Sequence, residues 1–278
     1  MTDAGISFWE ASFLWRDPLI AAGLGALLCA LAGTFVVLKR SAFVGAAVSQ
    51  AAGFGVVGAL LAPHVVGIEV PPLGAGILAG TASAGLFSLS RRGGRVGVEA
   101  SIAIAYVVAG AGSLLLGTFL THEYESVHSL LFGDAVAAPP EELVALGATS
   151  AVVVLLHLAF GRKFLFVSFD PETAQAMGVP IRRYNAALYF SAGLSLAVAT
   201  RALGALPVFA LTVAPAAGGL LLFDRLRRVL AWAVGTALAS ALVGYYLSFV
   251  WEKPTGAMIV LCAVLALVPG AARRALGR

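Results

Sequence analysis

Histidine and carboxylate side chains gather in one polar stretch of the sequence, between two long apolar runs. They are His122, Glu123, Glu125, His128 and Asp134. Imidazole and carboxylate groups together form the ligand set of borderline divalent metal ions. A charged loop is often simply solvated, and two histidines six residues apart are not a coordination signature. The stretch is therefore either a metal site or a negative mouth that attracts cations.

A second group of polar residues stands inside the apolar runs themselves. Ser49 and Gln50 lie in the middle of the run 42–62. An unpaired amide in hydrocarbon is costly, so the pair needs a purpose. It either forms a hydrogen bond between helices or lines a polar pathway for a substrate.

Thr212 and Pro215 occupy a similar place in the run 205–223. A proline inside a helix is expected to kink it and to free the carbonyl of the residue four positions earlier, here Leu211. A free carbonyl at membrane depth is tolerated beside protein or a water-filled cavity. The proline is thus either a structural kink or part of the same polar pathway.

The most distinctive segment is a polar insert, residues 168–180, which is typical of a short capped helix. Asp170 can accept hydrogen bonds from the first free N–H groups, and Pro171 suits the first helical position. Glu172 suits the positive end of the helix dipole, and Gly178 can adopt the left-handed backbone conformation that ends a helix. A helix of about two turns is marginal alone in water, so we expect a partner to hold it.

The composition places all these residues in a membrane protein. Apolar residues make up 60% of the 278, charged residues only 12%, and the mean hydropathy is +0.96. One soluble core could not bury that much apolar surface, so the chain is expected to lie in a lipid bilayer. The basic residues sit in twos and threes at the ends of apolar runs, which excludes a nucleic-acid-binding face.

About 20 apolar residues are needed to cross a bilayer, and the sequence offers nine such runs. The predicted fold is an all-α polytopic membrane protein, a compact bundle of about nine helices in one domain, 1–278. A short link with Arg201 and Gly204 separates the sixth and seventh runs, so eight spans are the alternative. The runs are 18–38, 42–62, 72–90, 100–121, 142–161, 185–200, 205–223, 229–250 and 256–271.

Basic residues at the ends of these runs predict the orientation. With nine spans, all the basic clusters fall on one side, which the positive-inside rule makes cytoplasmic. The N-terminus is then outside, with residues 1–17 as an outer interfacial segment, and the C-terminus is inside. The polar insert lies in a cytoplasmic loop, 164–184. The clusters are Lys39 and Arg40; Arg91, Arg92 and Arg95; Arg162 and Lys163; Arg182 and Arg183; Arg225, Arg227 and Arg228; and Arg273, Arg274 and Arg278.

Motifs for chemistry within the chain are missing from the sequence. There is no G-x-x-x-x-G-K-[ST], so the chain does not bind ATP through a P-loop. No nucleophile–base arrangement indicates an intramembrane enzyme. A channel or secondary carrier that works without ATP predicts charged residues within the spans, but the carboxylates stand at span ends or in loops.

Four stretches resemble, in order, the membrane subunits of the zinc/manganese ABC importer family. These bacterial permeases work with a separate ATPase and a metal-binding protein. The stretches are Val36 to Gly45 with Ser49 to Ala52; Glu99 to Tyr106 with His122 and Leu130 to Asp134; Ser168 to Pro180; and Thr212 to Ala217.

The resemblance implies a role for the polar insert. It is similar to the cytoplasmic coupling helix that docks on the ATPase and transmits its movement. The contact residues would be Asp170, Pro171, Glu172, Gln175, Met177 and Gly178. The resemblance further implies an external metal-binding protein, a homodimer, no cofactor on this chain, ATP used by the separate subunit, and a place in the bacterial cell (inner) membrane.

One departure limits what the resemblance implies about the metal. Many relatives carry Asp and His on the second span, where this chain has Ala46 and Gln50. Direct chelation by this helix is therefore not expected. A Gln–Ser pair suits a partly hydrated cation better than tight zinc binding, which favours nitrogen or sulfur ligands. An ABC permease for a metal chelate is an alternative, although such proteins are usually longer.

Overall fold

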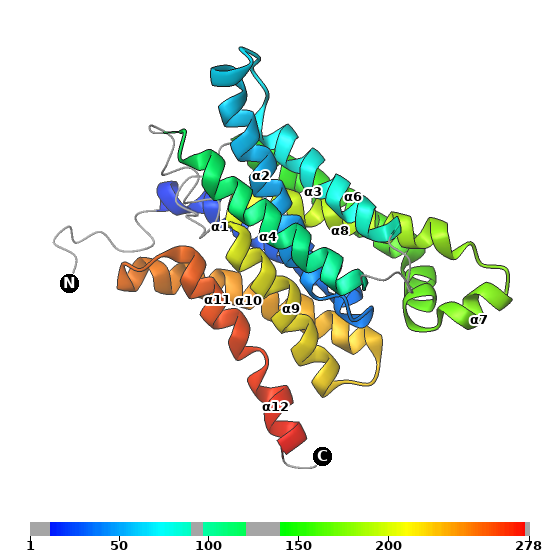
Figure 1. The fold of residues 1–278 in the computed structure, drawn as a ribbon. Coiled ribbons are helices and arrows are strands. Elements are labelled where there is room, and N and C mark those ends of the chain that lie inside the picture. Colours follow the sequence, from blue (N-terminus) through cyan, green and yellow to red (C-terminus); the bar gives the residue numbers. More distant parts are fainter. Residues whose placement is uncertain (1–11, 90–96, 121–139, 276–278) are drawn as a thin grey trace.

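A computed structural model describes residues 12–89, 97–120 and 140–275 of the chain (Figure 1). These residues contain helices and no strand, which confirms the predicted all-α class. Nine of the helical stretches in these ranges are long and apolar enough to cross a membrane. The helices are α1 (Ser12–Leu38), α2 (Phe43–Val65), α3 (Pro72–Leu89), α4 (Val98–Gly117), α6 (Pro140–Phe169), α7 (Pro171–Ala176), α8 (Ile181–Leu203), α9 (Ala205–Leu222), α10 (Leu226–Trp251), α11 (Thr255–Leu265) and α12 (Val268–Ala275).

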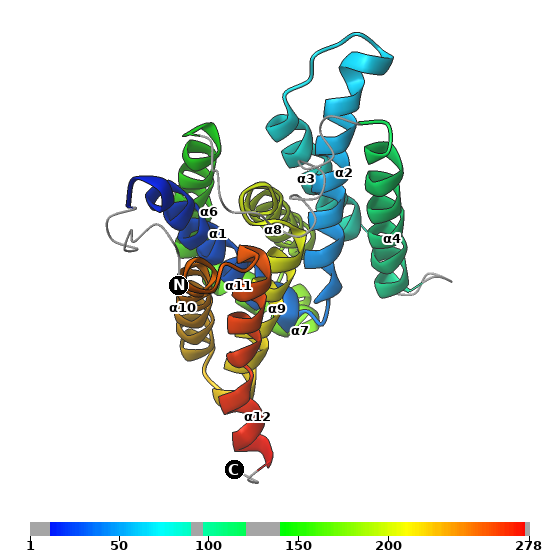
Figure 2. The ribbon, with the colours of Figure 1, turned by 90° about the vertical axis from the view of Figure 1, so that its left-hand side faces the viewer.

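The spans form two groups that meet along α8 and α9. Figure 2 shows α2, α3 and α4 together on one side, and α1, α6, α10 and α11 on the other. Helix α8 packs against both α3 and α1, and α9 packs against α1, α2 and α10. A single residue, Gly204, joins α8 to α9, with a positive φ of 87°. The sixth and seventh predicted spans are therefore separate helices, and only this one residue lies between them.

Small residues allow the helices to approach closely, as the sequence predicted. A Cβ atom built on Gly33 of α1 would lie 2.0 Å from the Thr212 carbonyl oxygen of α9. On Gly80 of α3 it would lie 2.7 Å from the side chain of Ala197 of α8. Because lipid tails are as apolar as the helices, such close van der Waals contact replaces the hydrophobic effect in holding the bundle together.

Several boundaries differ from the predicted spans. Helix α6 continues to Phe169, eight residues past the predicted end at 161, because Arg162 and Lys163 end the apolar run without breaking the helix. The connection between α6 and α8 is thus shorter than the predicted loop 164–184. Helix α1 starts at Ser12, so the described part of the segment 1–17 continues directly into the first span.

Candidate coupling helix and translocation cavity

The polar insert folds as the sequence predicted, into the six-residue helix α7. Asp170 is its N-cap, with Oδ1 accepting a hydrogen bond from the Thr173 N–H at 3.0 Å. Hydrogen bonds from the Thr173 side chain and backbone N–H lower the pKa of Asp170 below its usual value. The carboxylate is therefore charged at neutral pH, and the cap is lost only as the pH falls through the lowered pKa.

The stop of α7 also matches its prediction. Gly178 has a φ of +76°, in the left-handed region that favours glycine. Its N–H donates to the Gln175 carbonyl at 3.0 Å, and the Val179 N–H donates to the Ala174 carbonyl at 3.0 Å. These bonds satisfy carbonyls that the helix end would otherwise leave free.

One side of α7 is anchored and the other is open. Ala174 is fully buried where α7 packs against α6 and α8. On either side of α7, Phe169 and Met177 are 77% and 70% exposed. Large apolar side chains beside a polar, solvent-facing helix are suited to contact with another protein.

Gln50 lines a cavity of about 710 Å³ between α2, α4 and α9. The Gln50 carbonyl Oε1 is buried and has no hydrogen-bond partner within the described residues. It lies against Gly110, where an added Cβ would be 3.4 Å from this oxygen. Among the described residues, Tyr106 is the other polar side chain that lines the cavity. The rest of the described lining is apolar: Phe43, Ala46, Val107, Gly110, Ala111, Leu114, Ala205, Leu206 and Phe209.

The other three candidate pathway residues are buried in helix contacts. The Ser49 hydroxyl donates to the Gly45 carbonyl at 2.9 Å, and the Thr212 hydroxyl donates to the Val208 carbonyl at 2.6 Å. Pro215 is buried within α9, which continues on both sides of it as one helix. Of the four, Gln50 is the residue that lines this cavity, and its buried Oε1 has no hydrogen-bond partner within the described residues.

The five candidate metal ligands of the stretch 122–134 lie outside the described residues. They are His122, Glu123, Glu125, His128 and Asp134. Within the ranges that the structure describes, no group of three or more His, Cys, Asp or Glu side chains could hold a metal ion.

An ion pair between α6 and α8 was not predicted from the sequence. Arg201 Nε lies 2.7 Å from Glu142 Oε1, and the exposed fractions of the two side chains are 27% and 8%. The partners are 59 residues apart in the chain, so no local pattern could join them. The pair fixes the start of α6 to the end of α8, next to the Gly204 connection.

Breaking this pair from one side is expected to destabilise the bundle. Arg201→Met would leave the Glu142 carboxylate buried without its partner, at a cost of about 3 kcal/mol. The double variant Glu142→Gln with Arg201→Met leaves no buried charge and should recover most of that loss. Thermal unfolding in detergent measures the stability of both variants. If the double variant is destabilised as much as Arg201→Met, the loss does not come from leaving the Glu142 carboxylate buried without a partner.

The comparisons with known proteins fit this geometry. The family model described as the ABC 3 transport family matches residues 12–274. A manganese transport system membrane protein, MntC, of Halalkalibacterium halodurans is 30% identical over 89% of this chain and 83% of its own length. A probable iron transport system membrane protein of Haemophilus influenzae is 29% identical over 88% of each chain.

A solved structure shares the fold. PsaBC from Streptococcus pneumoniae, in complex with Fab, matches with a TM-score of 0.81 at 21% identity, covering 95% of this chain and 94% of that chain. The family match spans nearly the whole sequence, from α1 to α12. The chain belongs to the ABC 3 transport family.

Proposed function

We propose that this chain is the membrane-spanning subunit of an ATP-driven importer for a divalent metal ion of the zinc or manganese class. The observation that carries the proposal is α7, a capped polar helix flanked by the exposed apolar side chains of Phe169 and Met177, placed between two spans of an ABC 3 family member. Because the sequence has no P-loop, the ATPase is a separate subunit. It docks on α7 at the cytoplasmic face.

The proposed cargo is supported by the relatives and by the cavity at Gln50. Two relatives are named as manganese and iron transport proteins. The polar side chains at the cavity, Gln50 and Tyr106, offer oxygen ligands, which suit Mn²⁺ or a partly hydrated cation better than tightly bound Zn²⁺. An external metal-binding protein delivers the ion, and the stretch 122–134 supplies a negative entrance.

A second copy of the chain completes the pathway in this proposal. Several side chains that line the cavity are also exposed to the surroundings: Phe43 at 52%, Val107 at 61% and Leu114 at 58%. A cation would not cross the membrane along a groove open to lipid, because hydrocarbon offers it no ligands. A homodimer closes the groove, and the cavity then alternates between the two faces of the bacterial inner membrane.

Reconstitution tests the proposal. The permease, its ATPase and its metal-binding protein are placed in liposomes, and the uptake of Mn²⁺ and of Zn²⁺ is followed with and without ATP. We expect uptake of the ion only when ATP and both partners are present. Uptake without ATP would identify a channel or secondary carrier, and uptake of a chelate alone would overturn the proposed cargo.

A further inference from the structure

The connection from α7 to α8 is short and held by backbone hydrogen bonds. The Val179 N–H donates to the Ala174 carbonyl at 3.0 Å, and the Ile181 N–H donates to the Val179 carbonyl at 2.8 Å. The first bond ties Val179 to α7, and the second ties Ile181, the first residue of α8, to Val179. A displacement of α7 is therefore expected to move the first turns of α8 as well, because the short connection cannot extend freely.

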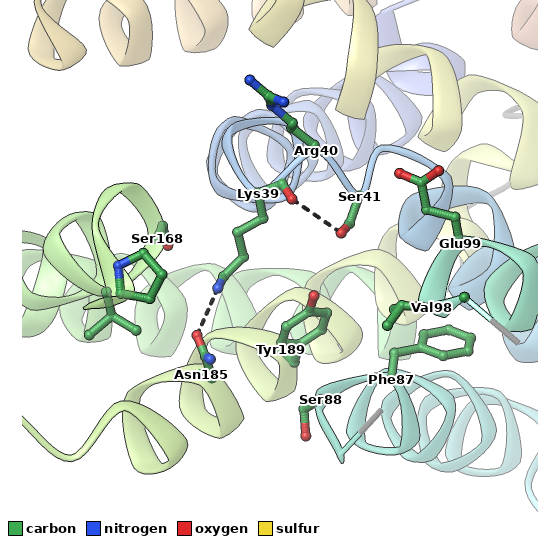
Figure 3. Close-up of a pocket in the computed structure, with 13 residues that line it drawn as sticks. Lys39, Arg40, Ser41, Phe87, Ser88, Val98, Glu99, Ser168, Asn185 and Tyr189 are labelled. Atoms are coloured by element: carbon green, nitrogen blue, oxygen red, sulfur yellow. Dashed lines mark hydrogen bonds between the residues drawn. The ribbon is translucent and has the colours of Figure 1, made fainter. Parts of the chain in front are cut away.

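These first turns of α8 contact the end of α1 through Lys39. The Lys39 ammonium donates to Asn185 Oδ1 at 2.7 Å, and it lies 5.8 Å from the centre of the Tyr189 ring (Figure 3). Asn185 and Tyr189 are four residues apart, so they share one face of α8. A charged hydrogen bond and a cation–π contact thus converge on one ammonium group.

Lys39 is also the first residue of the tight turn that leads into α2. The Arg40 N–H donates to the Val37 carbonyl at 2.9 Å, and the Ser41 N–H donates to the Val36 carbonyl at 3.1 Å. Helix α2 begins at Phe43, and Gln50 follows seven residues later, about 10 Å along the helix. A shift at Lys39 is thus passed to the helix that carries Gln50.

A cavity of about 600 Å³ lies beside this contact and gives it room to move. Figure 3 shows Lys39, Asn185 and Tyr189 on one side of it and Phe87 and Val98 on the other. It also reaches Pro171, the first residue of α7. A close-packed core would resist a rearrangement here, whereas the open space allows the start of α8 to shift.

We propose that Lys39 is a positioning residue of transport, which with Asn185 and Tyr189 transmits the movement of α7 from α8 to α2. The inference rests on the proposed function, since an ATPase must move α7. Lys39 does not contact the metal ion. It acts by keeping the α1–α2 turn attached to the segment that the ATPase displaces.

Two variants remove the hydrogen bond from opposite sides. Lys39→Met keeps the length of the side chain and loses the charge, and Asn185→Leu keeps the shape and loses the acceptor. In liposomes with the ATPase and the binding protein, each is expected to raise the ATP hydrolysed per metal ion imported about tenfold, the effect of losing one charged hydrogen bond. The double variant should be no worse than either single one.

Matched control variants distinguish a loss of transmitted movement from a general disturbance of the structure. Lys163 of α6 lies 5.4 Å from the centre of the Tyr184 ring, also in the first turns of α8, but it does not join α8 to α1. Lys163→Met, and Asn185→Asp, which keeps an acceptor, should leave the ratio within about twofold of the original protein. Stability in detergent and ATPase binding should be unchanged in all variants.

The outcomes distinguish this inference from the function itself. A normal ratio in Lys39→Met, or effects that multiply in the double variant, would overturn the role of Lys39 while leaving the importer intact. If Lys39→Met does not insert, Asn185→Leu alone decides in the same way. Absence of ATP-driven uptake by the unaltered complex would instead overturn the proposed function.

Discussion

Gly178→Val is expected to reduce ATP-driven metal uptake by at least about tenfold, without reducing the amount of permease in the membrane. Gly178 has a φ of +76°, and a side chain in this region costs about 1–2 kcal/mol, more for a β-branched one. A shift of that size changes the population of the correct conformer by about five- to thirtyfold. The stop of α7 would be lost, and α7 would no longer present its open side to the ATPase.

Gly67 provides the matched control on the opposite side of the membrane. It follows α2 with a φ of +74°, and an added Cβ meets no atom within 4 Å at either glycine. Gly67→Val therefore imposes the same backbone strain away from α7. Uptake should fall only in the Gly178 variant, with both measured at equal permease density. Equal losses in the two variants would mean that strain in general, and not the placement of α7, limits transport.

Gln50→Leu is expected to reduce uptake at least about tenfold while leaving ATPase binding intact. The Gln50 Oε1 is a buried acceptor without a partner in the described residues, beside a cavity whose other walls are apolar apart from Tyr106. A cation in this cavity would lose an oxygen ligand, and hydrogen bonds or ligation to a charge are worth about 1.5–3 kcal/mol each. Leucine keeps the volume of the side chain, so helix packing is preserved.

Ser49→Ala is the control for Gln50. Ser49 is adjacent in the sequence, but its hydroxyl bonds to the Gly45 carbonyl of its own helix and is fully buried. Its removal should change uptake by less than about twofold. Initial rates of Mn²⁺ uptake at several concentrations measure both variants. Full activity in Gln50→Leu would contradict a pathway through this cavity.

Local chemistry explains why α7 could be predicted from the sequence. The cap at Asp170, the first-turn proline and the left-handed Gly178 each depend on neighbours within a few residues. The nine spans were predicted for a similar reason, because hydropathy over 20 residues needs no tertiary information. The predicted end of the fifth span, residue 161, was too early for the helix. Arg162 and Lys163 mark where the apolar run ends, whereas the helix itself continues until a breaking residue such as Pro171 follows.

Contacts between distant residues could not be predicted in this way. Lys39 and Asn185 are 146 residues apart, and Glu142 and Arg201 are 59 apart. Gln50 was singled out because an amide in an apolar run is costly, but its cavity is built from three helices. Ser49 and Thr212 carried the same signal, and each turned out to bond within its own helix. Only the packing shows which polar residue is left without a partner.

The central claim is that a separate ATPase binds at α7, and photocrosslinking tests it most directly. A benzophenone amino acid replaces Met177, which is 70% exposed beside α7, or Val65, which is 72% exposed at the far end of α2. After illumination of the assembled complex in membranes, we expect a covalent product with the ATPase from position 177 and none from position 65. A complex that still imports metal but gives no ATPase product from position 177 would contradict the account.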